Sequence, residues 1–237
     1  MTWATWSTTW STVSSDPFEV VRHPRARRAR LVFDPASGRA RLVLPQRAAL
    51  KPALAWAHGK TDWIAEQRAR LPEARPFAHG ATLTIADEAL TIEHRPEGPR
   101  GVSRGTDRLV VGGPAEGLAR RVELWLRRAA LDLLATETAE FAALAGVAVE
   151  RVAVGDPRGR WGSCSSRGAI RYSWRLVLAP GWVRRATVAH EVAHRVHMDH
   201  GPAFHALVAE LLGEDPTPAR HWLKANGTAL HWFGSTG

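Results

Sequence analysis

Short runs in which apolar and polar residues alternate dominate residues 17–113 and predict a β-rich region. ARLVFDP and ARLVLPQ are two strand-like runs, and the ASGR between them is typical of a hairpin turn. Three more short strands, ATLTIA, ALTIEH and DRLVVGG, are predicted around residues 82–112, with the Pro/Gly-rich EGPRGVSRG as a loop. Between the two sets, residues 47–71 show the helical period, which His58-Gly59 divides and Pro72 ends.

Helical periodicity predominates after Gly113-Pro114, and we place a domain boundary there. A helix is predicted over residues 115–146, then a strand over 147–154, the polar turn GDPRGRWGSCSSRG and the strand AIRYSWRLVL. Three helices are predicted in the final part of the chain: residues 181–198, 202–212 and 217–226. The last of them has Thr217 as N-cap and Gly227 just past its end. The order of elements predicts an α+β fold.

The composition is that of a globular protein, with 45% hydrophobic and 23% charged residues. No run approaches the roughly 20 apolar residues that span a bilayer, so we expect no membrane partner. Residues 1–16 lack the basic and apolar regions of a signal peptide, and their Ser/Thr/Trp composition predicts a disordered tail. Cys164 is the only cysteine, so no internal disulfide can form. We therefore expect a reducing compartment, the cytoplasm.

The formal net charge of +9 and the pI of about 11 permit contact with nucleic acid, nucleotides or another polyanion. The chain has 29 Arg against 3 Lys, however, alongside abundant Ala and Gly. All three frequent residues have GC-rich codons, so the basicity can equally reflect genome composition. The charge alone leaves both explanations open.

The strongest chemical signal is the run His190-Glu191-Val192-Ala193-His194. Two histidines four residues apart lie on one face of a helix, so both imidazoles can reach a single metal ion. Glu191 is too close in sequence to bind the ion alongside them, and it can instead take a proton from a water molecule that the metal activates. This pattern predicts one catalytic Zn²⁺ with Glu191 as general base.

A catalytic zinc needs three protein ligands, and His197 and His200 are the candidates for the third. In a helix that continues to residue 198, His197 would lie two turns from His190, about 10 Å along the axis. His200 is followed by Gly201-Pro202, which lets the chain turn back. We therefore favour His190, His194 and His200 as ligands and assign His197 to the surroundings of the site.

Four residues of the polar turn have two interpretations: Arg160, Trp161, Ser163 and Cys164. They can line the cleft and orient substrate, or form a Gly-rich turn with Trp161 and Cys164 in the core. We favour the structural interpretation. Tyr172, the only tyrosine, and Arg175 are further candidates for stabilising an oxyanion.

The segments RWGSCSSRGAIRYSWRLVLAP and HEVAHRVHMDHGPAFHALV resemble the YgjP-like metallopeptidase family, a group related to the WLM and SprT-like zincins. The resemblance is closest from about Arg160 to Gly227. It implies a minimal zincin core over residues 114–237, in which a small sheet packs on the active-site helix. It also implies zinc and the same ligands, with Glu191 as the catalytic residue. One departure is His205, which stands where Trp is expected.

Three functions are compatible with these residues. Zinc-dependent hydrolysis of a peptide bond is the first. Hydrolysis of a nucleoside triphosphate at a phosphoanhydride bond is the second, because the family has been associated with it and a basic protein suits a triphosphate. The third is a protease that processes DNA-associated proteins, by analogy with the WLM and SprT-like relatives.

Overall fold

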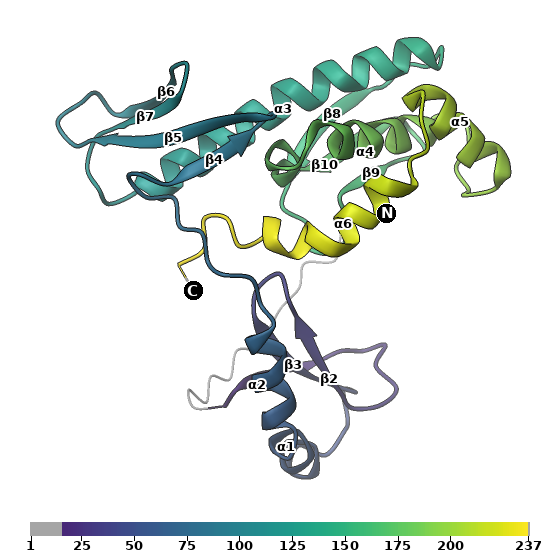
Figure 1. Ribbon diagram of the computed structural model, residues 1–237. Helices are drawn as coiled ribbons and strands as arrows, with labels where there is room; N and C mark the ends of the chain where they lie inside the picture. The colour runs from purple at the N-terminus through teal and green to yellow at the C-terminus, as the bar shows by residue number, and fades with distance from the viewer. Residues whose placement is uncertain (1–15, 237) are drawn as a thin grey trace. The chain divides into compact units, whose positions relative to one another are not determined.

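The computed structural model describes residues 16–236 and divides the chain into two compact units, Met1–Leu71 and Pro72–Gly237 (Figure 1). Except for Asp16, the predicted tail of residues 1–16 lies outside the described residues. None of the described helices combines the length and the apolar character needed to cross a membrane.

The N-terminal unit is a three-stranded sheet covered on one face by two short helices. Its strands lie in the order β1-β3-β2, with β1 parallel to β3 and β2 antiparallel to it. Ala40, Leu42 and Leu44 alternate along β3 and are buried with Ala57 and Ile64 of the helices. The predicted hairpin and the break at Gly59 are both present. The elements are β1 Phe18–Arg22, β2 Arg30–Asp34, β3 Arg39–Leu44, α1 Leu50–His58 and α2 Thr61–Ala69.

The second unit begins with a four-stranded sheet in the order β4-β5-β7-β6. Strand β6 lies in the segment predicted as a loop, and that prediction was wrong. The Pro/Gly-rich segment folds back on β7 because Gly112 has no side chain, and a Cβ there would overlap the carbonyl of Pro99. The strands are β4 Thr82–Ile85, β5 Glu88–Arg95, β6 Gly101–Arg104 and β7 Arg108–Gly112.

The division between the units lies at residues 71–72, not at the predicted boundary of Gly113-Pro114. Sheet residues such as Leu83 and Leu109 share one core with Leu126 and Leu134 of helix α3, Leu118–Leu144. The change of sequence pattern from strands to helices therefore marks a change of element here and not a boundary between units, because both kinds of element cover the same apolar core.

A second, three-stranded sheet follows α3 in the order β8-β10-β9, with β8 parallel and β9 antiparallel to β10. Strand β9 lies inside the predicted polar turn. The predicted strand of residues 169–178 ends at Ser173 and continues as a 3₁₀ helix, Trp174–Leu178, where the Ser173 hydroxyl accepts from the backbone N–H of Arg175. The strands are β8 Arg151–Gly155, β9 Gly162–Cys164 and β10 Ala169–Ser173.

Three helices complete the unit: α4 Gly181–Ala193, α5 Pro202–Leu212 and α6 Thr217–Leu230. Helix α4 packs against α3, α5, α6 and the edge strand β9, which is the small-sheet-on-helix arrangement expected of a minimal zincin core. The prediction that α4 reaches residue 198 was wrong. Its last turn tightens to i→i−3 hydrogen bonds at Arg195 and Val196, and the chain leaves the helix.

Helix α6 starts where the prediction placed it, but Thr217 is its first residue and not its N-cap, and its C-terminal end lies further along. It begins at Thr217, whose backbone N–H donates to Asp215 Oδ1 at 2.9 Å, and it continues through Gly227 to Leu230. Gly227 is therefore not a helix terminator. A Cβ at this position would lie 2.7 Å from the indole ring of Trp161, so the glycine lets α6 approach that ring closely.

Candidate active site

Three histidine side chains converge where α4 ends and α5 begins. Helix α4 carries His190, His194 follows at its C-terminal end, and His200 lies just before α5. One ring nitrogen from each lies within 4.8 Å of the others, and Nε2 of His190 is 3.3 Å from Nε2 of His200. In the described part of the chain this is the one group of three such residues able to hold a metal ion.

The geometry of these rings, and the protonation of His190 and His194, fit a tetrahedral zinc ion. Two nitrogens bound to one zinc at about 2.0–2.1 Å lie about 3.3 Å apart, close to the separation of His190 and His200. Burial lowers the pKa of His190 to about 4, and His194 and His200 beside it add to the effect. Burial also lowers the pKa of His194. Both imidazoles are therefore neutral at pH 7, which is the form that binds a metal.

His197 contributes its backbone, not its ring. Its carbonyl oxygen lies 3.0 Å from Nδ1 of His194 and accepts a hydrogen bond from it, which leaves Nε2 of His194 to face the other two imidazoles. The chain can make this contact because α4 has already ended. The structure thus brings His200 into the cluster and places His197 beside it.

Phe204, in the first turn of α5, packs against all three imidazoles and was not predicted as a site residue. It is fully buried, and its ring centroid lies 4.9, 4.6 and 4.7 Å from those of His190, His194 and His200. The aromatic ring limits the rotation of the histidine side chains. The sequence feature that could have identified Phe204 as a site residue is its position in HGPAF, just after the turn at Gly201-Pro202 that follows His200.

Glu191 lies beside the histidine cluster and is buried, with 5% of its surface exposed. Burial raises the pKa of its carboxyl group to about 7, against the opposing charge of Arg160. Gly162 of β9 packs directly against it, since a Cβ on Gly162 would lie 2.6 Å from Glu191 Cδ. Sequence reasoning missed Gly162, although it stands in the middle of the WGSCS element.

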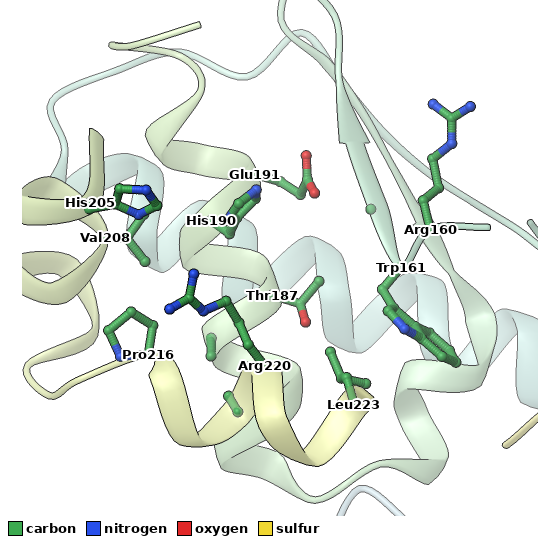
Figure 2. A pocket seen from close by; sticks show the side chains of 13 residues that line it. Arg160, Trp161, Thr187, His190, Glu191, His205, Val208, Pro216, Arg220 and Leu223 are labelled. Atoms are coloured by element: carbon green, nitrogen blue, oxygen red, sulfur yellow. The ribbon is translucent and has the colours of Figure 1, made fainter. Parts of the chain in front are cut away.

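A pocket of about 270 Å³ opens beside His190 and Glu191. Figure 2 shows Thr187, His190 and Glu191 along α4, with Arg220 and Leu223 of α6 on the facing wall. Much of the wall is formed by apolar or small side chains: Trp161, Ala186, Val208, Pro216, Ala219 and Leu223. The contribution of α6 had no signal in the sequence, because it depends on how that helix packs.

Arg160 and Trp161 line this pocket, so the functional interpretation applies to them in part. Trp161 also packs against the hydrophobic core, as the structural interpretation predicts. Ser163 pairs with Arg171 in the sheet and does not line the pocket. Cys164 is half-buried, its thiol donates to the carbonyl of Ser165, and burial raises its pKa.

Neither Tyr172 nor Arg175, the further candidates for stabilising an oxyanion, lines the pocket. Tyr172 is fully buried, and its hydroxyl lies 3.0 Å from Thr138 Oγ1 of α3. Arg175 donates to both carboxylate oxygens of Asp156, at 2.7 and 3.0 Å, and to the carbonyls of Leu230 and Phe233. Both side chains therefore form hydrogen bonds within the fold.

Comparison with known proteins agrees with this site. No curated protein and no solved structure matches the chain. A family model described as "YgjP-like, metallopeptidase domain" matches residues 27–226, which is well over half of the sequence. The match includes the complete cluster of histidines and Glu191. The chain therefore belongs to the YgjP-like metallopeptidase domain family, a membership that supports metal-dependent hydrolysis as its chemistry.

Proposed function

We propose that this protein is a zinc-dependent peptidase in which His190, His194 and His200 hold one zinc ion and Glu191 is the general base. The observation that carries the proposal is the buried carboxylate of Glu191 beside three convergent imidazoles at the mouth of a pocket. Family membership supports the same reaction class.

Glu191 performs the proton transfers in this mechanism. When bound at such a site, zinc polarises the substrate carbonyl and lowers the pKa of a water molecule. Burial makes the Glu191 carboxylate a stronger base than an exposed one, so it can take the proton of the attacking water. The protonated side chain then donates to the leaving amine. Gly162 leaves the space that this carboxylate occupies.

The edge of strand β9 supports a peptide as substrate. The segment of β9 is hydrogen-bonded to the neighbouring strand β10 on one side only. Trp161 O accepts from Ser173 N–H, and Ser165 N–H donates to Ala169 O. The alternation of antiparallel ladders therefore turns the backbone groups of Gly162 and Cys164 toward the other edge, where no strand pairs within residues 16–236. An extended peptide can add to this edge and pass beside Glu191. The pocket next to it would then receive one substrate side chain.

The first experiment compares the wild type with Glu191→Gln for zinc content and for hydrolysis of an unfolded protein. We expect the variant to retain zinc and to lose at least ~10²-fold in hydrolysis, because the substituted amide cannot accept the proton. Glu210→Gln, an exposed carboxylate on α5, is the matched control and should retain activity. Normal hydrolysis by Glu191→Gln would exclude the mechanism. His194→Ala should instead lose the metal.

Hydrolysis of a nucleoside triphosphate is the second candidate, and Arg160 and Arg220 favour it. Both residues line the pocket beside His190 and Glu191, and guanidinium groups pair with phosphate oxygens. Incubating the zinc-loaded protein with nucleoside triphosphates and with an unfolded protein separates the two reactions. Consumption of the nucleotide alone would replace the peptidase proposal.

A further inference from the structure

The positive charge of the protein is concentrated in its N-terminal unit. Residues 1–71 contain twelve Lys and Arg and five Asp and Glu, a net charge of +7, whereas residues 72–237 contain twenty and eighteen, a net charge of +2. A GC-rich genome would enrich arginine in both units, and the second unit indeed has many. There, however, acidic residues almost balance them. Genome composition therefore does not explain the excess charge of the first unit.

The topology gathers six of these arginines at one end of the sheet. Because β1 is parallel to β3 and β2 is antiparallel to it, the end of β1, the start of β2 and the end of β3 meet there. The β1–β2 loop crosses this end, and the segment after β3 leaves from it. We call the resulting surface the arginine end; it comprises Arg22, Arg25, Arg27, Arg28, Arg30 and Arg47.

Arg22 fixes the two segments of the arginine end to each other. Its guanidinium donates to the carbonyls of Pro45, Gln46 and Ala48, at 3.1, 2.6 and 3.1 Å, and His23 N–H donates to Leu44 O at 2.8 Å. The β1–β2 loop and the segment around Arg47 therefore form one continuous, ordered surface.

The remaining five arginines of this surface are exposed and unpaired. Among the described residues, no carboxylate forms an ion pair with the side chains of Arg25, Arg27, Arg28, Arg30 or Arg47. The sequence has no acidic residue between positions 20 and 33 or between 35 and 61. The sheet carboxylates, Glu19 and Asp34, lie at the opposite end, where they neighbour Arg41.

We propose that the arginine end binds the phosphate backbone of a nucleic acid. Guanidinium groups pair with phosphate oxygens through two parallel hydrogen bonds, and several at one surface match a regularly charged polymer. An anionic membrane fits less well, because the residues among these arginines from 23 to 29 are His, Pro and Ala, with no large apolar side chain to enter a bilayer. The surface belongs to the N-terminal unit and the histidine cluster to the second unit, so the binding does not rest on the proposed peptidase activity.

The test measures binding of the full-length protein to a fluorescent duplex DNA of about 30 base pairs over roughly 50–200 mM salt. The variant is Arg25→Gln/Arg27→Gln/Arg28→Gln. The matched control, Arg120→Gln/Arg151→Gln/Arg167→Gln, removes the same charge from exposed positions of the second unit. We expect the first variant to lose at least ~10-fold in affinity at about 100 mM salt. Its slope of log affinity against log salt should be shallower by about 2 to 3. The control should bind almost as the wild type does.

Three outcomes would overturn the proposal: no binding by the wild type at low salt, equal losses in the two triple variants, or binding to phosphatidylserine vesicles without binding to nucleic acid. Single-stranded DNA and RNA of the same length identify which backbone is preferred. Circular dichroism checks that the variants fold, and Arg30→Gln/Arg47→Gln tests the other side of the same surface. Hydrolysis of an unfolded protein by the first triple variant should be unchanged, which separates a failure here from a failure of the peptidase proposal.

Discussion

At the scale of single residues, Gly162 controls the space that Glu191 occupies. Gly162→Ala places a methyl group against the carboxylate, so the side chain must move and the proton transfer loses its geometry. We expect about a 10²-fold loss of hydrolysis, since misplacement by about 1 Å has effects of that size. Zinc content should not change. Gly159→Ala is the control, because a Cβ there meets no atom within 4 Å. Full activity of Gly162→Ala would contradict this role.

Asp156 provides a pH-dependent contribution to stability through Arg175. Burial alone would raise the pKa of Asp156, but the two hydrogen bonds and the charge of Arg175 hold it below the ordinary value of 3.8. A lowered folded-state pKa means that the contribution is fully present above pH 3.8 and is lost as the pH falls through the folded pKa.

The prediction for Asp156→Asn follows from that sign. Urea unfolding at pH 7 should show a loss of about 1 kcal/mol, a value reduced for the partial exposure of the pair. The difference between wild type and variant should shrink as the pH falls below about 4. A difference that stays constant down to pH 2 would contradict the role of the charge.

At the scale of elements, the turn between β4 and β5 stabilises the start of helix α4, which carries His190 and Glu191. Ala86 and Asp87 have φ values of 51° and 70°, a left-handed conformation that favours Asp or Asn over most other residues. Asp87 Oδ1 accepts from the backbone N–H of Gly181 at 2.7 Å, and Oδ2 lies 3.6 Å from Arg184. The turn therefore supplies a hydrogen-bond acceptor to the N-terminus of α4, a helix that is distant from it in the sequence.

Asp87→Ala should lower the free energy of unfolding of the second unit by about 1 kcal/mol, because an N-terminal N–H of α4 loses its acceptor. Asp87→Asn keeps both an acceptor and the tolerance of positive φ, so it should recover most of that loss. Thermal unfolding of both variants measures the effect. Equal losses in the two would show that the charge near Arg184, and not the cap, is responsible.

Elements with a strong local signal could be predicted, whereas those made by packing could not. The β2–β3 hairpin and the break at Gly59 depend on turn chemistry within a few residues. Strands β6 and β9 depend on a neighbouring strand to pair with, so their Gly-rich sequences indicated loops. Gly227 was interpreted as a helix end, although the glycine is explained by the Trp161 ring that packs against it.

At the scale of the whole molecule, the two units have separate hydrophobic cores. The core of the N-terminal unit is small and centres on Phe18, Leu42, Leu44 and Ile64. Leu42→Ala should therefore lower the stability of that unit by about 2–5 kcal/mol. Hydrolysis and zinc content should be retained, because the histidine cluster lies entirely in the second unit. Amide hydrogen exchange, recorded separately for the residues of each unit, measures the loss of stability. Equal loss of protection in both units would contradict separate cores.

The sequence by itself determined which residues form the candidate site of this protein. The i, i+4 spacing of His190 and His194 places both rings on one helix face whatever surrounds the helix. The same periodicity sets the position of Glu191 beside them on the helix. The tertiary structure decided what surrounds those residues. The early end of α4 orients His194 through His197, while β9 and α6 form the walls beside Glu191. The pairing of β1 and β2 with β3 gathers the arginines at one end of a sheet. Each of these depends on contacts between segments far apart in sequence, which no local pattern encodes.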